Sequence, residues 1–342
     1  MKHINIPIFV PHKGCPHDCV FCNQKKITGQ TTDVTANDVT NIIDNHLLTI
    51  DKNDAYVEVA FFGGSFTAIE MHKQTELLNA VYPYVQSGRV KAVRCSTRPD
   101  AIDENILTNL KKYGVKTIEL GVQSTDEEVL LKSNRGHGRD VVFSSSKLIK
   151  DYGFDLGLQM MLGLPGDTYE KSIQTAKDII SLSPKCVRIY PTLVVEETGL
   201  LNMYNKGEYK PFDLEFTLSL CAEFLNMFYK ADIDVIRVGL QTTDNINEKT
   251  VIGPYHPCFR ELCESRIIRN LIEANMDKIT ENATVIVNRK NISKAVGNKK
   301  SNILYFKGKY NINLSVLPDE TIDLNHIALK SKNFECDLQI LG

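Results

Sequence analysis

Short β-rich runs alternate with longer helical patterns along most of this chain, and this alternation restricts the fold more than any other feature. A helical stretch between two strands is long enough to cross over a sheet, so consecutive strands can lie parallel in β-α-β units. The pattern predicts a parallel sheet, either doubly wound or closed toward a barrel. The predicted strands are residues 4–10, 56–62, 91–96, 116–121, 154–161, 186–190 and 234–240. The predicted helices are residues 35–50, 66–82, 103–113, 139–151, 169–182, 214–231 and 261–275.

The pattern changes after about Asn275. Polar segments there separate short apolar runs, which predict strands at residues 285–287, 303–306, 312–316 and 337–340. We therefore expect two units, an α/β unit over residues 1–275 and a small β-rich appendage over residues 276–342.

Composition and charge exclude several classes of protein. Of the 342 residues, 42% are hydrophobic and 24% are charged, which is ordinary for a globular chain. The formal net charge is −2, so any contact with a nucleic acid must be local. The apolar run at residues 4–10 is too short for a secretory signal, and no run approaches the roughly 18 residues that span a membrane. We expect a cytoplasmic protein with no membrane partner.

Three of the nine cysteines lie close together in the loop after the first predicted strand. The segment PHKGCPHDCVFC places Cys15, Cys19 and Cys22 in the spacing C-x3-C-x2-C. Three thiolates on one loop can hold three irons of a cubane cluster and leave the fourth iron open for a ligand. The alternative is a structural zinc site with three cysteines and either His12 or His17.

Glycine and polar residues follow the next strands at the edge where parallel α/β folds bind ligands. Gly63 and Gly64 end the second predicted strand and are followed by Ser65. Adjacent glycines let a ligand approach the backbone, although a simple turn also explains them. The third strand leads into Arg98, and the fourth into Gln123 and Ser124. An arginine at this edge can pair with a carboxylate of a ligand, or it can form an ordinary salt bridge.

The cysteine spacing, with Phe21 just before the last cysteine, resembles the radical S-adenosylmethionine superfamily. The resemblance implies an incomplete (β/α)6-type TIM-like barrel and a 4Fe-4S cluster on the three cysteines. In that family the methionyl group of S-adenosylmethionine binds the open iron, and one-electron reduction releases a 5′-deoxyadenosyl radical that abstracts hydrogen from a substrate. The resemblance also implies an electron donor such as flavodoxin or ferredoxin. The implied cofactor-binding residues are Gly63, Gly64, Ser65, Arg98, Gln123 and Ser124, with Ser65 standing where an acidic residue is common.

Further segments narrow the resemblance to the radical domain of the Elongator catalytic subunit and its bacterial relatives. Those segments are FFGGSF, STRPD, IELGVQS, NRGH, LGLPGDT and RIYPTLV followed by GEYKP, in order across residues 5–240. That subunit modifies the wobble uridine of transfer RNA and carries an acetyltransferase domain after the radical domain. The residues after Asn275 hold no glycine-rich loop that would cradle a pyrophosphate, so we do not expect acetyl-coenzyme A chemistry here.

A basic segment favours an RNA substrate. Residues 285–310 contain seven lysines and arginines, no Asp or Glu, and the aromatic residues Tyr305, Phe306 and Tyr310. Such a segment can neutralise phosphates and stack bases, or it can be a solvated basic surface. Two alternatives stay open: a radical enzyme that acts on a small molecule, and a non-catalytic metal-binding RNA protein. No residue is assigned to hydrogen transfer itself.

Overall fold

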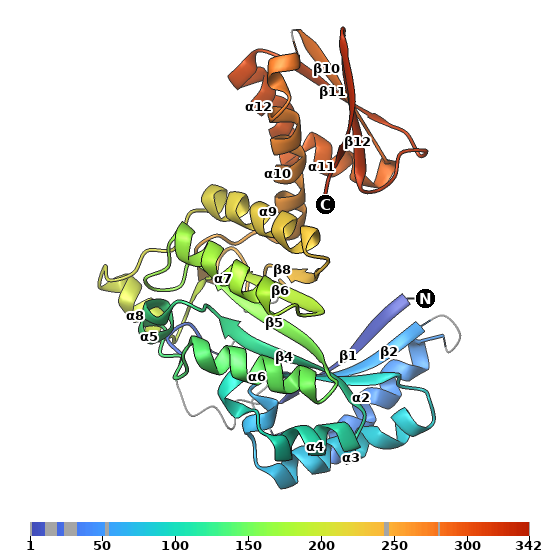
Figure 1. Cartoon of the computed structure of the whole chain (residues 1–342), viewed down its shortest axis with the longest axis vertical. Helices are drawn as coiled ribbons and strands as arrows, with labels where there is room; N and C mark the ends of the chain where they lie inside the picture. The colour runs from blue at the N-terminus through green and yellow to red at the C-terminus, as the bar shows by residue number, and fades with distance from the viewer. Residues whose placement is uncertain are drawn as a thin grey trace.

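The computed structural model describes residues 2–10, 19–23, 33–51, 55–242, 246–279 and 281–341 (Figure 1). Its largest element is a seven-stranded sheet in the order β1-β2-β3-β4-β5-β6-β8, in which every neighbouring pair is parallel. The spatial order follows the chain order and the sheet curls without closing, so the fold is a partial barrel, as predicted. The strands are β1 (Lys2–Val10), β2 (Ala55–Gly63), β3 (Ala92–Thr97), β4 (Val115–Gln123), β5 (Asp155–Leu162), β6 (Cys186–Pro191) and β8 (Asp234–Val238).

Helices between the strands cover the outer face of the sheet (Figure 1). Local caps explain where several of them begin. Thr35 and Asp38 form the predicted capping box, in which each side chain accepts a hydrogen bond from the other residue's backbone N–H. The carboxylates of Asp103 and Asp213 cap two further helices. The helices are α2 (Ala36–Thr49), α3 (Met71–Gln86), α4 (Glu104–Lys112), α6 (Arg139–Asp151), α7 (Tyr169–Ser181) and α9 (Leu214–Lys230).

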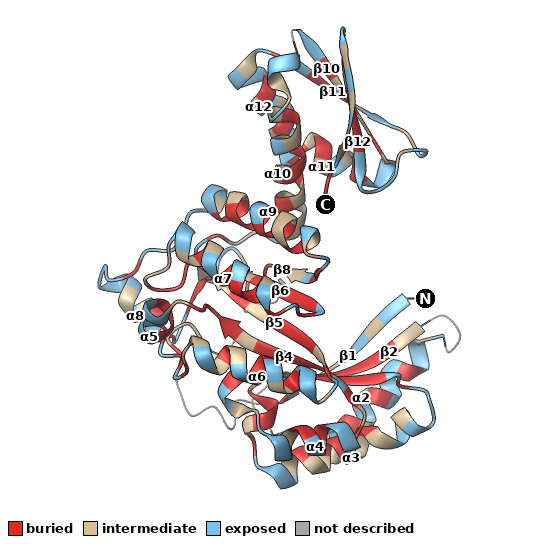
Figure 2. Ribbon diagram, viewed as in Figure 1, coloured by how far each residue is buried: buried red, intermediate tan, exposed pale blue. Residues whose placement is uncertain are grey.

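The strand period of two separates an apolar outer face from a polar inner face. Val59, Val93 and Ile118 are fully buried between the sheet and the helices. Figure 2 shows buried residues concentrated along the strands and on the helix sides that face them. Residues one position away, such as Glu58 and Glu119, point to the inner face of the partial barrel. The core therefore lies outside the curl, and the inner face is free to carry polar chemistry.

The C-terminal unit stands apart from the barrel and is joined to it by α10 (Phe259–Glu273), as Figure 1 shows. Its four-stranded sheet has the order β11-β10-β12-β13. The strands are β10 (Asn282–Val287), β11 (Asn313–Pro318), β12 (His326–Ser331) and β13 (Phe334–Gln339), and the helices are α11 (Ile292–Val296) and α12 (Ser301–Tyr310).

The strand predicted at residues 303–306 was wrong, because these residues belong to α12. A four-residue apolar run fits either a strand or a helix. The buried residues Asn302 and Phe306, four positions apart, show the helical period. β12 was not predicted.

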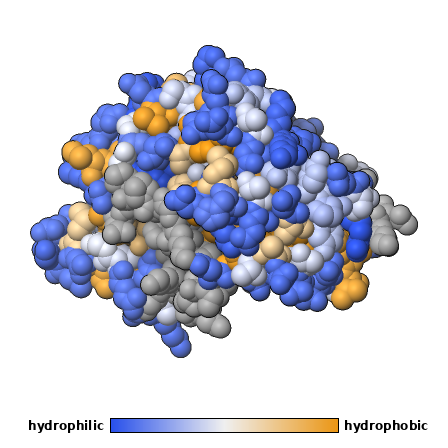
Figure 3. Space-filling model, turned by 90° about the horizontal axis from the view of Figure 1, so that it is seen from below, coloured by the Kyte–Doolittle hydropathy of each residue, from blue (hydrophilic) through white to orange (hydrophobic). Residues whose placement is uncertain are grey.

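The face seen from below in Figure 3 is mostly hydrophilic, with apolar atoms in small separate patches among the coloured residues. Within the described ranges, no helix is long and apolar enough to cross a membrane.

Candidate active site at the carboxyl ends of the strands

Two of the three loop cysteines lie in the described residues, and a tight turn holds them together. The backbone N–H of Cys22 donates to the carbonyl of Cys19 at 3.0 Å. This turn keeps the two cysteines on one short loop, as two ligands of a single cluster require. Cys15, His12 and His17 lie outside the described residues, and within those residues no three potential ligands group around one metal position.

Backbone hydrogen bonds connect the cysteine turn to two short helices, α5 (Glu127–Lys132) and α8 (Gly199–Asn205). Sequence reasoning did not predict these helices. Val20 donates to the carbonyl of Ser133, just after α5, at 3.2 Å. The carbonyl of Val20 accepts from Leu200 in α8 at 2.7 Å. The elements that follow β4 and β6 thus position the cysteine segment.

Apolar packing adds to these bonds. Val20 and Phe21 pack against a buried cluster of Val194, Leu200 and Tyr209. The hydroxyl of Tyr209 donates to the carbonyl of Gly163 at 2.6 Å. The segments LGLPGDT, RIYPTLV and GEYKP therefore meet under the cysteine turn and support it.

The glycine pair lies against the end of β1, directly before the cysteine loop. A Cβ atom on Gly63 would lie 2.5 Å from the carbonyl oxygen of Val10, and the φ of Gly63 is 103°. The N–H of Gly64 donates to the same carbonyl at 3.0 Å. The fold itself therefore requires glycine at position 63, and it places the glycine pair against the last residue of β1.

Two buried arginines face the sulfur of Cys19. Arg135 Nη1 lies 3.2 Å from Cys19 Sγ, and Arg98 Nη1 lies 3.9 Å from it. All three residues are buried. Arg98 also donates to the carbonyl of Arg135, and Arg135 to that of Gly121, so both guanidinium groups are held in place. The end of β3, through Arg98, and the segment between α5 and α6, through Arg135, thus place positive charge beside the cysteine turn.

The two arginines differ in how their charge is balanced. Arg98 makes a two-point ion pair with Asp100, at 2.8 and 3.0 Å, and this pair lowers the pKa of Asp100 against the opposing effect of burial. Arg135 pairs with no carboxylate in the part of the chain that the structure describes, and its buried Nε has no hydrogen-bond partner there. A buried cation without a counter-charge is costly, so this position favours an anionic ligand.

His137 adds a neutral polar group to this cluster. Burial lowers its pKa to about 4, and the nearby Arg135 contributes in the same direction. Its buried Nε2 has no partner among the described residues. Sequence reasoning missed Arg135 and His137, although both lie in the NRGH segment that the resemblance rested on.

The other predicted residues at this edge have distinct environments. Gln123 is buried with φ 68°, a left-handed conformation that is unusual for glutamine, and its side chain accepts from Gln159 at 3.2 Å. Such strain concentrates at functional sites. Ser124 accepts from the N–H of Asp126 at 3.1 Å, so it helps to start α5. Ser65 is buried directly after the glycine pair.

A buried network of charged side chains crosses the inner face of the sheet below this cluster. Arg94 donates to Glu58 at 2.7 Å and to Glu119 at 2.9 Å, and Arg188 donates to Glu119 through two nitrogens. Two arginines and two glutamates balance each other here, unlike Arg135. The network contains its own counter-charges, so it favours a structural role.

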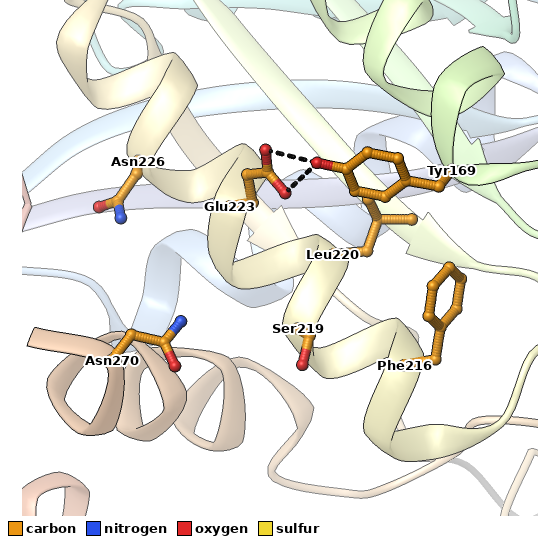
Figure 4. Close-up of a pocket in the computed structure, with 7 residues that line it drawn as sticks. All are labelled: Tyr169, Phe216, Ser219, Leu220, Glu223, Asn226 and Asn270. Carbon is orange, nitrogen blue, oxygen red and sulfur yellow. Dashed lines mark hydrogen bonds between the residues drawn. The ribbon is translucent and has the colours of Figure 1, made fainter. Parts of the chain in front are cut away.

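The described residues line at least two cavities. The first, of about 440 Å³, shares Arg98 and Asp100 with the arginine cluster, and Thr67 also lines it. The second, of about 320 Å³, lies between α7, α9 and α10 on the outer side (Figure 4). There Tyr169 donates to Glu223, and no cysteine or arginine lines the walls. The first cavity adjoins Arg98, whose Nη1 lies 3.9 Å from Cys19 Sγ, whereas the second lies against the outer helices.

Comparison with known sequence families decides the affiliation of the chain. The profile of the Radical SAM superfamily matches residues 9–179, and that of the Radical_SAM C-terminal domain matches residues 184–269. The chain belongs to the Radical SAM superfamily. It is therefore an enzyme of the radical SAM class, as predicted. The first match includes the cysteine loop, the glycine pair, Arg98, Gln123 and Arg135.

Individual relatives point to the Elongator branch of this superfamily. The chain is 31% identical over 176 residues to a tRNA uridine(34) acetyltransferase of Methanocaldococcus infernus, covering 46% of this chain and 33% of the relative. It is 30% identical over 197 residues to human Elongator complex protein 3, covering 52% and 35%. The matches thus span about a third of the length of these relatives.

A solved structure supports the fold. The archaeal Methanocaldococcus infernus Elp3 with an N-terminal deletion superimposes with a TM-score of 0.57 at 20% sequence identity. The superposition covers 95% of this chain and 74% of that chain. At this identity the likeness concerns the fold, which includes the partial barrel.

Proposed function

We propose that this radical SAM enzyme binds a 4Fe-4S cluster through Cys15, Cys19 and Cys22, cleaves S-adenosylmethionine reductively and abstracts hydrogen from a transfer RNA. The cofactor would lie along the glycine pair and Ser65, with Gln123 and Ser124 on the next strand ends. We also propose that residues 1–275 form the catalytic unit and residues 276–342 an accessory unit.

The observation that carries this proposal is the excess positive charge beside Cys19. A cluster with three thiolate ligands and the carboxylate of S-adenosylmethionine are both anionic, so both fit a buried guanidinium that lacks its own counter-ion. Arg98 has Asp100 as its partner, whereas Arg135 has no carboxylate partner within the described ranges. We therefore assign the cofactor carboxylate to Arg135, with Arg98 as a neighbour that holds it in place.

The chain's own residues would then fix and shield the reacting groups. When bound, the cluster and cofactor together would supply a 5′-deoxyadenosyl radical. Arg135 would orient the cofactor against the cysteine turn, and Gly63 and Gly64 would leave room for its methionyl group. Val20, Phe21 and Tyr209 would exclude water from beneath the turn, and neutral His137 would offer a hydrogen-bonding nitrogen.

Transfer RNA is proposed as the substrate because the curated relatives named above include a tRNA uridine(34) acetyltransferase. The proposal covers the RNA class and does not extend to acetyl transfer. The electron would come from a small donor protein such as flavodoxin or ferredoxin.

Two measurements test the proposal. Anaerobic reconstitution with iron and sulfide should yield a protein that binds both and releases 5′-deoxyadenosine from S-adenosylmethionine, whereas a zinc protein would take up no sulfide. Nucleosides of transfer RNA from wild-type and deletion cells should differ by at least one modification. Identical nucleosides, with intact cofactor cleavage, would remove RNA as the substrate and favour a small molecule.

A further inference from the structure

Most of the positive charge in residues 285–310 lies at α12 and the turn before it. Three basic residues of this segment form ion pairs: Lys294 with Glu264 at 2.8 Å, Lys309 with Glu273 at 2.6 Å, and the exposed Arg289 with Glu320 at 4.0 Å. By contrast, Lys299, Lys300 and Lys307 are exposed. In the described part of the chain, no carboxylate lies within ion-pair distance of these three lysines. We call Lys299, Lys300 and Lys307 the α12 lysine face.

The aromatic residues of the segment are not free to stack on bases, contrary to the reading of the sequence. Phe306 is fully buried. Tyr305 and Tyr310 both donate to Glu273 at 2.5 Å. Arg269 and Lys309 lie over the ring of Tyr305, at 4.7 and 5.3 Å from its centre. The structure therefore indicates that this surface binds a ligand through its positive charge and not through stacking on aromatic rings.

A buried asparagine fixes the turn that displays two of the lysines. The fully buried side chain of Asn302 donates to the carbonyls of Lys294 and Ala295 at 3.1 Å and accepts from Arg269 at 2.9 Å. Lys299 and Lys300 are both left-handed, with φ 50° and 62°. A left-handed backbone conformation costs a lysine about 1–2 kcal/mol, so the contacts around the turn must stabilise this conformation. The turn that carries Lys299 and Lys300 thus has a backbone conformation that buried contacts fix.

The helix continues the same surface. Lys300 directly precedes α12, and the exposed Lys307 lies in its last turn, so the helix carries the positive charge beyond the turn. The exposed Leu304 and Lys307, three positions apart, share one side of α12, and the buried Asn302 and Phe306 lie on the opposite side. In Figure 1, α12 flanks the small sheet on the left, the side on which α5 and α8 mark the carboxyl ends of the barrel strands.

We propose that the α12 lysine face binds the phosphate backbone of the RNA substrate and reads no base. This inference rests on the proposed RNA substrate and adds the docking surface. The charge of the surface matches a phosphate chain, and its engaged aromatics exclude recognition by stacking.

The experiment measures binding of bulk transfer RNA to the reconstituted full chain between 50 and 200 mM salt. The wild-type dissociation constant should rise with salt, and Lys299→Glu with Lys300→Glu should weaken binding at least about tenfold and reduce the log–log salt slope by about 2. Lys307→Glu should also weaken binding, and because Lys307 lies in a regular, exposed turn of α12, this change should not disturb the fold. The matched control is Lys91→Glu with Lys332→Glu, which makes the same charge change at exposed sites elsewhere. Cofactor cleavage without substrate should be unchanged in every variant.

The outcomes separate the docking surface from the proposed function. If wild-type protein binds transfer RNA and the α12 variants bind as well as the control, the docking inference fails and the RNA substrate stands. If wild-type protein binds no RNA, both fail. A hairpin RNA of scrambled sequence should bind like transfer RNA, and a preference of more than about tenfold for one sequence would overturn the claim that no base is read. Equal binding of polyglutamate would assign the surface to an acidic protein partner instead.

Discussion

Replacing Gly63 by alanine should damage both the stability of the barrel and the formation of the cluster. The new Cβ atom would lie 2.5 Å from the Val10 carbonyl oxygen, about 0.9 Å short of the 3.4 Å of ordinary contact. A side chain at φ 103° costs about 1–3 kcal/mol, and pushing a packed strand end aside costs a similar amount. We expect a loss of about 2–6 kcal/mol in the free energy of unfolding. Val10 is the last residue of β1 before the cysteine loop, so iron bound per chain should fall as well.

Gly153 provides a matched control for this change. It also has a positive φ, of 83°, but nothing lies within 4 Å of its hypothetical Cβ atom. Gly153→Ala should therefore cost only the backbone strain, about 1–2 kcal/mol, and leave iron binding intact. Urea unfolding followed by circular dichroism suits this chain, which has no tryptophan. Equal losses for the two variants would refute the contact with Val10 as the cause.

Three further outcomes follow from buried charges. Arg135→Gln should weaken S-adenosylmethionine binding by about 10–100-fold, measured at equilibrium, with unchanged iron content. The control Arg139→Gln, on the outer helices, should bind the cofactor as wild type does. Equal affinities of the Arg135→Gln variant and wild type would remove Arg135 from the cofactor site. Glu119→Gln should lower the free energy of unfolding by about 3–5 kcal/mol, because it leaves buried guanidinium charge uncompensated, and a loss below 1 kcal/mol would show that the network is dispensable. Burial raises the pKa of Asp167 to about 6, so its contribution to stability is present at low pH and is lost as pH rises from about 3.8 to 6. Asp167→Asn should gain about 3 kcal/mol relative to wild type across that interval, and parallel pH profiles would contradict the raised pKa.

The barrel was predictable because its signals are local and repeated. Each strand is a short β-rich run, and the helix after Thr35 begins at a capping box that the sequence shows directly. The C-terminal unit was harder to predict, since residues 303–306 fit both a strand and a helical period and the burial of Asn302 and Phe306 in the folded chain shows the helical one. α5 and α8 are short, and their contacts with Val20 are visible only in the folded chain.

In the candidate site, too, local patterns were predictable from the sequence and tertiary contacts were not. The cysteine spacing predicted one loop that carries all three cysteines, and the sequence placed the glycine pair at the end of the next strand. It did not reveal which arginine lacks a counter-charge. Arg98 is followed two residues later by Asp100, a pairing that the sequence itself suggests. Arg135 reaches Cys19 from a segment 116 residues away, so its role depends on tertiary contacts that no local pattern encodes.

The most direct test of the proposed chemistry replaces each loop cysteine by alanine and measures cluster absorbance and 5′-deoxyadenosine after anaerobic reconstitution. Loss of both signals in every one of the three variants is expected, because three thiolates are the minimum for a cluster with one open iron. Cys336→Ala, in β13 of the C-terminal unit, is the control and should keep both signals. Cofactor cleavage that persists in any of the variants at Cys15, Cys19 or Cys22 would contradict the proposed function.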